Sequence, residues 1–188
     1  MIYMFLADGF EEIEALCPLD LLRRAGIAVT TVGVGHKTVT GAHGIAVLAD
    51  LTDAEFAAKE NKETEGVILP GGMPGTLNLG ASETVISALR AAHEAGLLIC
   101  AICAAPSVPG ELGMLAGKRA VCFPGFEGSL KGAENTSARV ERDGNLITAV
   151  GMGAALEFGL AIVSALRGRE AAEKLSAAVL APAGTVIA

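Results

Sequence analysis

Short apolar runs alternate with stretches of helical character along the chain. Several of these runs are continuously apolar, which is typical of strands buried on both faces of a sheet. The expected strands span residues 1–7, 27–34, 45–49, 66–70, 97–102, 119–122 and 146–150. The expected helices span residues 10–25, 53–63, 83–95, 106–116, 153–167 and 169–177. This order predicts an α/β fold with a doubly wound, mostly parallel sheet sandwiched between helices.

Single residues predict where two of these helices begin and end. Asp8 and Glu11 have the spacing of a capping box at the start of the first helix. Pro18 lies well inside that helix and is expected to kink it or to end it early. Ser82 is a suitable N-cap for the helix at 83–95, and Gly96 is expected to stop it.

The length and composition favour one domain. The chain has 188 residues, of which 52% are apolar and only 4% aromatic. A chain of this length can bury a sizeable core, and abundant Ala and Gly let helices and sheet pack closely. No internal repeat, low-complexity tract or Pro/Ser-rich linker interrupts it, so residues 1–188 are expected to form a single domain. Residues 139–145 read as a strand edge followed by a hairpin turn.

The charge balance limits the partners. Lys and Arg total 14 against 21 Asp and Glu, a net charge of −7, which argues against nucleic acids and anionic membranes. Residues 1–8 lack a basic leader and reach Asp8 too soon for a signal peptide, so a first strand is expected there. The uncharged stretches near 66–82 and 95–110 contain Gly and Pro and are poor membrane spans. We expect a cytoplasmic protein with four reduced cysteines, no membrane partner and no nucleic-acid partner.

Cys103 is the strongest candidate for a reactive group. It follows the apolar run 97–102 and precedes Ala104, Ala105 and Pro106, which indicates a strand, a sharp turn carrying a thiol, and a helix start. Serine hydrolases place their nucleophile on such an elbow. A helix dipole at this position is expected to favour the thiolate. The alternative is a buried structural cysteine.

Cys100 and Cys103 also form a C-x-x-C pattern. Because side chains alternate along a strand, residues three apart are expected to point to opposite faces, which disfavours a redox dithiol. Two further strand ends supply polar groups. Glu11 and Glu14 share a helix face after the first strand, where a solvated acidic first turn is the alternative. Gly71 and Gly72 follow the strand at 66–70 and either turn amides into a site or form an ordinary tight turn.

The chain resembles the ThiJ/PfpI superfamily, within it the branch that contains the Parkinson's-linked protein deglycase, over nearly its whole length. The resemblance rests on Glu11–Glu14 followed by Leu21–Gly26, on Val67–Gly72, on Ile102–Ser107 and on Glu157–Val163. It implies a flavodoxin-like fold with a nucleophile elbow, no cofactor and no metal.

The resemblance also implies residue roles. Cys103 matches the reactive cysteine, and Glu14 matches the carboxyl that hydrogen-bonds it. Gly71, Gly72 and Ala104 match the positions whose amides line an oxyanion-type pocket. We therefore expect Glu14 to be partly buried and protonated near neutral pH, since a protonated carboxyl would lower the pKa of the thiol, while Glu11 and Glu12 stay ionised.

Three positions depart from the family pattern or qualify it. Many relatives carry a histidine where this chain has Phe123, which cannot transfer a proton. His43 falls where relatives often place a basic residue near the pocket, and a surface hairpin histidine is the alternative. The peptidase branch has a histidine directly after the nucleophile, whereas this chain has Ala104, so proteolysis is not expected.

The expected function is a glutathione-independent glyoxalase or a protein deglycase, acting on methylglyoxal or its adducts with proteins. Cys103 would form a hemithioacetal, and Glu14 would shuttle the proton. The alternative is an oxidative-stress sensor or redox-regulated chaperone that works through Cys103 sulfenic or sulfinic acid. Relatives are commonly homodimers, and Arg23 and Arg24 of the first helix are a plausible contact.

Overall fold

Seven strands form one central sheet in the computed structural model, which describes residues 1–59 and 63–186. Its strands are β1 (Ile2–Leu6), β2 (Val29–Gly33), β5 (Leu51–Thr52), β6 (Gly66–Leu69), β7 (Leu98–Ile102), β10 (Val140–Asp143) and β11 (Leu146–Ala149). The strand order is β10-β11-β7-β6-β1-β2-β5, and each neighbouring pair is parallel except β10 and β11. The predicted doubly wound, mostly parallel sheet is confirmed.

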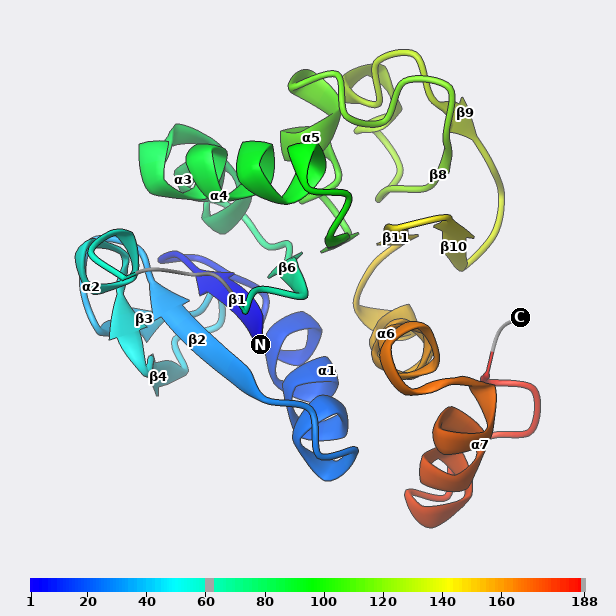
Figure 1. The fold of residues 1–188 in the computed structure, drawn as a ribbon. Coiled ribbons are helices and arrows are strands. Elements are labelled where there is room, and N and C mark those ends of the chain that lie inside the picture. The colour runs from blue at the N-terminus through cyan, green and yellow to red at the C-terminus, as the bar shows by residue number, and fades with distance from the viewer. Residues whose placement is uncertain (60–62, 187–188) are drawn as a thin grey trace.

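Helices cover both faces of this sheet (Figure 1). One layer contains α1 (Glu12–Arg24), α6 (Ala155–Arg167) and α7 (Arg169–Ala178). The other contains α2 (Asp53–Ala57), α3 (Gly75–Ala81), α4 (Glu83–Glu94) and α5 (Ser107–Glu111). Two short 3₁₀ turns, η1 (Glu127–Ser129) and η2 (Met152–Ala154), lie in the connections. Of the described helices, none is long and apolar enough to cross a membrane.

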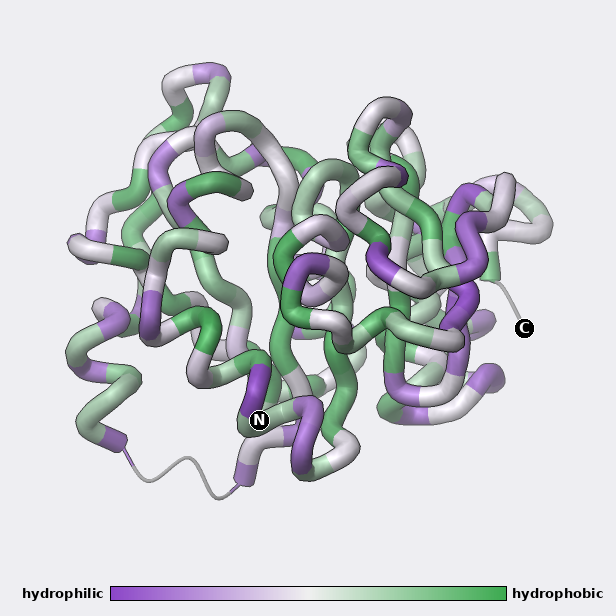
Figure 2. The backbone as a smooth tube through the Cα atoms, turned by 90° about the horizontal axis from the view of Figure 1, so that it is seen from above, coloured by the Kyte–Doolittle hydropathy of each residue, from purple (hydrophilic) through white to green (hydrophobic). Residues whose placement is uncertain are grey.

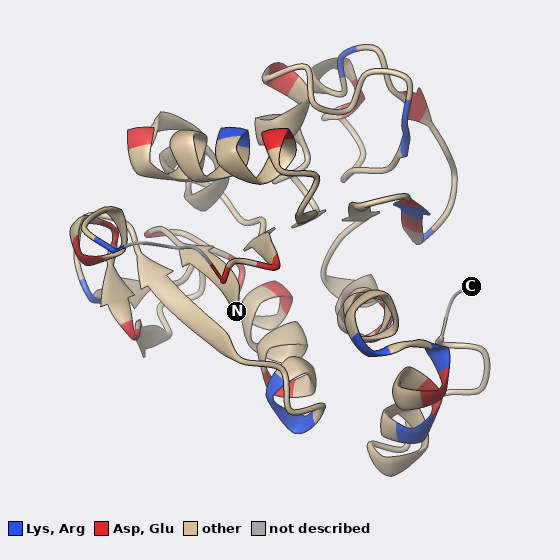
Figure 3. Ribbon diagram, viewed as in Figure 1, with Lys and Arg blue, Asp and Glu red and all other residues tan. Residues whose placement is uncertain are grey.

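The alternation of side chains along each strand divides the core in two. In β1, Ile2 and Met4 pack with α1 and α6, whereas Tyr3 and Phe5 pack with α2 and α4. Apolar residues follow the strands in Figure 2. Charged residues gather on helices and turns in Figure 3, and β1, β2, β6 and β7 carry none. Burial on both faces explains why β1, β6 and β7 are continuously apolar in the sequence.

Two expected strands lie outside the central sheet. The strand expected at 45–49 is β4 (Ala46–Leu48), which pairs with β3 (Thr38–Thr40) in a separate antiparallel hairpin. The strand expected at 119–122 is β8 (Arg119–Ala120), which pairs only with β9 (Glu134–Asn135). The sheet edge beside β2 is occupied by β5, so the hairpin lies outside the sheet and adds only Val39 and Val47 to the core layer of α1 and α6.

The first helix corrects two predictions. It begins after Glu11, whose Oε2 accepts a hydrogen bond from the Glu14 amide at 2.8 Å, so the predicted capping role of Asp8 is wrong. Of the two effects expected of Pro18, the early end does not occur, because the helix continues through Pro18 to Arg24. Pro18 is buried where α1 crosses α6, beside Gly159, and this packing outweighs the hydrogen bond that proline cannot donate.

Three other helices differ from their expected ranges. The helix expected at 53–63 corresponds to α2, which ends at Ala57. Residues 60–62 of the expected range lie outside the described part of the chain. The helix expected at 106–116 is only α5, and α3 was not expected at all. Ser82 does cap α4, accepting a hydrogen bond from the Val85 amide, and α4 ends just before Gly96, as predicted. The hairpin of β10 and β11 is likewise confirmed.

The site lies where adjacent strands end. In the sheet, β7, β6 and β1 are neighbours and parallel, so their carboxyl ends meet at one edge. Cys103 follows β7, Gly71 and Gly72 follow β6, and the chain after β1 leads through Glu11 into α1. Such edges are where open α/β sheets bind ligands.

Candidate active site

Cys103 occupies a strained turn between β7 and α5. Its φ is 66°, a left-handed conformation that a residue with a side chain seldom adopts and that costs about 1–3 kcal/mol. Two hydrogen bonds hold the turn: the Cys103 amide donates to the Ala149 carbonyl at 2.8 Å, and the Phe123 amide donates to the Cys103 carbonyl at 2.7 Å. The chain therefore forms the predicted nucleophile elbow.

The positive φ also changes the relation between the two cysteines of the C-x-x-C pattern. Both Cys100 and Cys103 pack on the core layer of α1 and α6, so the expectation that they face opposite sides is wrong. Strand alternation ends at Ile102, and the turn brings Cys103 back. Both thiols are free, and Cys100 is fully buried.

Glu14 is buried beside Cys103. Only 1% of the residue is exposed, and its Oε2 accepts a hydrogen bond from the Gly71 amide at 2.9 Å. Burial raises the pKa of Glu14 to about 7, while the hydrogen bond with Cys103 opposes this shift. Its Oε1 has no hydrogen-bond partner among residues 1–59 and 63–186. Glu14 is buried as expected, and its raised pKa agrees with the expectation that it carries a proton near neutral pH.

The thiol differs from expectation. Burial, followed by the neighbouring Glu14 charge, raises the pKa of Cys103 to about 12, although the backbone amides of Ala104 and Gly72 oppose this shift. The predicted lowering by a helix dipole is wrong, because α5 has only five residues and begins three residues after Ala104. Thiol and carboxyl share one environment, so they lose their protons as a coupled pair.

Gly71 and Gly72 allow the backbone to approach both groups. A Cβ at Gly71 would lie 2.6 Å from the Cys103 Cβ and 2.6 Å from Glu14 Oε2. Gly72 has φ +91°, and a Cβ there would lie 2.3 Å from the Glu11 amide nitrogen. The amides of Gly72 and Ala104 lie near enough to the Cys103 sulfur to lower its pKa. A side chain at either glycine would fill the space in which the backbone approaches Cys103 and Glu14.

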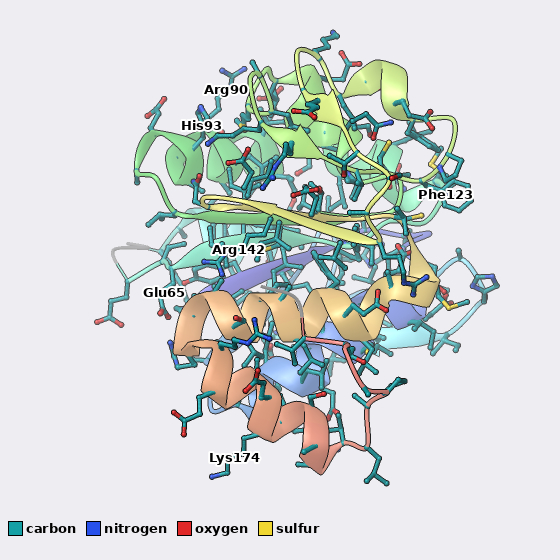
Figure 4. All side chains as sticks on the ribbon, turned by 90° about the vertical axis from the view of Figure 1, so that its right-hand side faces the viewer. Glu65, Arg90, His93, Phe123, Arg142 and Lys174 are labelled. Carbon is teal, nitrogen blue, oxygen red and sulfur yellow. The ribbon has the colours of Figure 1, made fainter. Side chains whose placement is uncertain are left out.

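Phe123 and Met152 stand beside the pair. The Phe123 ring lies 3.3 Å from the Cβ position of Gly151, and Glu14 Oε1 lies 3.8 Å from the same point. Phe123 is 47% exposed and Met152 is 53% exposed. Figure 4 shows Phe123 at the opposite end of the molecule from Glu65, which immediately precedes β6, and so at the carboxyl edge of the sheet.

Sequence reasoning missed Gly151 and Met152. They directly follow the strand expected at 146–150, whose observed counterpart β11 lies next to β7. The carboxyl end of that expected strand was the sequence signal that could have pointed to Gly151 and Met152.

His43 has other contacts. It lies in the turn between β3 and β4, its Nδ1 is 2.8 Å from Glu12 Oε2, and its backbone amide donates to Glu12 Oε1 at 2.8 Å. The described contacts of His43 do not include Cys103 or Glu14. Glu11, Glu12 and His43 offer ligand atoms within 4.8 Å of one another, but both oxygens of Glu12 already accept hydrogen bonds from His43. We interpret this cluster as an ion pair that anchors the hairpin.

Two hollows of the described surface lie elsewhere. One of about 620 Å³ runs between α2 and α4 and is lined by residues such as Phe56, Ala88 and Leu97. Another of about 490 Å³ is lined by Asp8, Asn78 and neighbouring residues. Neither is lined by Cys103 or Glu14. We place the site at Cys103 because nucleophile, carboxyl and converging amides meet only there among the candidates that the sequence offers.

Comparisons with known proteins show the family to which the chain belongs. A family model described as the DJ-1/PfpI family matches residues 1–165. Protein dj-1beta from Drosophila melanogaster is 37% identical over 182 residues, covering 94% of this chain and 95% of that protein. Deglycase PH1704 from Pyrococcus horikoshii is 31% identical over 145 residues, covering 76% and 84%. The solved structure of oxidized Toxoplasma gondii DJ-1 superposes with a TM-score of 0.90 at 33% identity, covering 96% of this chain and 97% of that one.

Proposed function

Because the chain belongs to the DJ-1/PfpI family, we propose that it is a cysteine-dependent enzyme that converts methylglyoxal or its adducts to a hydroxy acid without glutathione. The observation that carries this proposal is the contact between the Cys103 thiol and a buried carboxyl with a pKa of about 7. A base with such a pKa is suited to proton transfer at neutral pH.

The first step forms a covalent bond. The sulfur of Cys103 attacks the aldehyde carbon, and the carboxylate of Glu14 takes the thiol proton as the bond forms. The amides of Gly72 and Ala104 stabilise the developing oxyanion. The oxyanion then takes a proton from Glu14, which gives a hemithioacetal and regenerates the carboxylate. Because the thiol pKa is raised, the proton leaves during attack and not beforehand.

The second stage moves hydrogen along the substrate. Glu14 removes the proton from the carbon bonded to sulfur, and the electrons move to the neighbouring carbonyl oxygen to give an enediolate. Glu14 returns this proton to the second carbon, and the hydroxyl proton on the first carbon passes to the second oxygen, which produces a thioester with a hydroxyl group on the second carbon. Water then hydrolyses the thioester, releasing the hydroxy acid and the Cys103 thiol. The net reaction adds one water to the 2-oxoaldehyde and needs no oxidant or reductant.

Because this chain has Phe123 where many relatives have a histidine, we assign both proton transfers to Glu14. A phenyl ring cannot accept or donate a proton, so a mechanism with a histidine at this position does not apply here. The same chemistry serves a deglycase, because removing free aldehyde also reverses early adducts with proteins. One relative is named a deglycase.

Assembly and location form a further part of the proposal. We infer a homodimer, with α1 as a contact. Arg23 of α1 already pairs with Asp50 at 3.1 Å and Arg24 with Asp20 at 2.6 Å, so the arginines would present neutralised charges to a partner. We also infer a cytoplasmic location, which the four free cysteines support.

The direct test is product formation. The purified protein is incubated with methylglyoxal, and lactate is followed by an enzyme-coupled assay, with Cys103→Ser and Cys17→Ser compared. Cys17 is also a half-buried free thiol and serves as the matched control. We expect lactate from the wild type and Cys17→Ser and none above background from Cys103→Ser. Lactate formation that survives in Cys103→Ser would reject the proposal.

A redox sensor or redox-regulated chaperone is the second candidate, and the solved oxidized form of Toxoplasma gondii DJ-1 favours it. Cys103 is half-buried, whereas Cys100 and Cys122 are buried, so peroxide should reach Cys103 first. Mild peroxide treatment followed by peptide mass spectrometry tests this order. Oxidation of Cys100 or Cys122 before Cys103 would rule the sensor out.

A further inference from the structure

We propose that Phe123 and Met152 form an apolar wall that selects neutral ligands with an aryl or bulky alkyl substituent at Cys103. This inference deepens the proposed function: among 2-oxoaldehydes, those with such a substituent are the preferred substrates. Phe123 and Met152 are the residues that determine this specificity, and neither takes part in proton transfer.

The position of the wall follows from contacts around Gly151. The Phe123 ring and Glu14 Oε1 both lie within 4 Å of the Cβ position of Gly151. Met152 is the next residue, and its backbone lies close enough to affect the pKa of Glu14. The Phe123 amide is bonded to the Cys103 carbonyl. The apolar side chains are thus fixed to the backbone that holds the nucleophile and the carboxyl.

The geometry of attack directs the substituent toward this wall. The carbon bonded to Cys103 sulfur carries an oxygen that faces the amides of Gly72 and Ala104, which lie in the turns after β6 and β7. The other substituent of that carbon must therefore point away from these two amides. Phe123 and Met152 are about half-exposed there, so an apolar substituent can bury surface against them.

Charge narrows the ligand class further. The charged group with the largest effect on the pKa of Cys103 is Glu14, and the one with the largest effect on Glu14 is Glu11. Both are acidic groups, and a negative charge on either would repel an anionic ligand. A ligand at this site is therefore expected to be neutral as well as apolar.

The test uses alkylation rates, because these report access to Cys103 whether or not the protein turns over a substrate. The probes are N-phenyl iodoacetamide, iodoacetamide and iodoacetate, which share a leaving group and differ in apolar bulk or charge. The rate constant at Cys103 is measured by peptide mass spectrometry. The rate constant of each reagent at Cys103 is divided by the rate constant of the same reagent with glutathione.

We expect the phenyl reagent to be favoured about tenfold over iodoacetamide, and iodoacetate to be disfavoured about tenfold, after this correction. Phe123→Ala and Met152→Ala should each reduce the phenyl preference to less than about threefold while keeping the discrimination against iodoacetate. Phe123→Leu should retain part of the preference. Leu180→Ala, which removes an exposed apolar side chain after α7, should change neither ratio.

Corrected rates within twofold of one another in the wild type would overturn the proposal, as would a preference that survives Phe123→Ala and Met152→Ala. A partner protein that covers the wall would produce the first of these results. A second measurement compares kcat/KM for phenylglyoxal and methylglyoxal. A phenyl preference in alkylation without turnover would reject the proposed enzyme and leave this inference standing, whereas turnover without any aryl preference would reject the inference alone.

Discussion

The carboxyl of Glu14 lies against the thiol of Cys103, although α1 carries one and the turn after β7 carries the other. Gly71 lies between the two elements and donates its amide to Glu14 Oε2 at 2.9 Å. Carboxyl and thiol therefore titrate as a pair, whose first proton is lost near pH 7. The proposed chemistry depends on this contact.

Gly71→Ala should separate the pair. The new methyl group would lie 2.6 Å from both the Cys103 Cβ and Glu14 Oε2, so one of them must move. We expect a loss of about 1–3 kcal/mol in unfolding free energy and a large drop in the alkylation rate of Cys103. Denaturant unfolding and alkylation kinetics measure the two effects. Gly128→Ala, with open space around its Cβ position, should leave both unchanged, and equal behaviour of the two variants would contradict the packing described here.

Glu14→Gln should gain stability relative to the wild type as the pH rises. Burial raises the pKa of Glu14 from 4.5 to about 7, so the folded state binds this proton more tightly than the unfolded state. Its contribution is fully present below about pH 4.5 and is lost as the pH rises through 7. The loss is about 3 kcal/mol. Urea unfolding of both proteins at pH 5 and pH 8 measures it; a stability difference that is the same at both pH values would show that Glu14 titrates normally.

Gly159→Ala should weaken the contact between α1 and α6. A methyl group at Gly159 would lie 2.6 Å from Leu21 Cδ1 and 3.0 Å from Pro18 Cα, and the backbone of Pro18 cannot easily yield. We expect a loss of about 1–3 kcal/mol in unfolding free energy. Gly153→Ala has free space and provides the control. A neutral effect of Gly159→Ala on urea unfolding would mean that the two helices can separate at little cost.

Glu12→Gln should lower the pKa of His43. The hydrogen bond to Glu12 and its charge raise the pKa of His43 above 6.5, while Glu12 itself has a lowered pKa. The ion pair stabilises the β3–β4 hairpin fully above the usual carboxyl pKa and below the usual histidine pKa, and it weakens as the pH rises through the folded pKa of His43. Titration of the His43 ring by NMR measures the shift, and Glu55→Gln is the control. An unchanged His43 pKa in Glu12→Gln would show that the pair does not form in solution.

Much of the fold followed from local patterns. Continuous apolar runs identified the parallel strands β1, β6 and β7, because burial on both faces leaves no polar alternation, and mainly apolar runs with threonine identified β2 and β11. The positions of short elements could not be predicted in this way. The strand β4 carries exposed apolar residues such as Leu48, which resemble a core strand in sequence, and only the pairing with β3 shows that it stands apart.

The position of the site was predictable from the sequence, but the pKa of its thiol was not. Cys103, Gly71 and Glu14 follow strands that are neighbours in a parallel sheet, so the topology brings them together. The raised pKa of Cys103 was not predictable, because it depends on burial and on the closeness of Glu14. His43 was predicted at the pocket, yet its place is set by Glu12. That residues 1–188 form a single domain stays a prediction.

The pH dependence of Cys103 alkylation by iodoacetamide tests the coupling of Glu14 and Cys103 most directly. In the wild type we predict a rate that rises with an inflection near pH 7, because the carboxylate formed there accepts the thiol proton. In Glu14→Gln that inflection should disappear, and the rate should rise only above the free-thiol pKa of about 8.5, since the sulfur is still desolvated. A wild-type inflection at about 8.5, or identical profiles for the two proteins, would contradict the account.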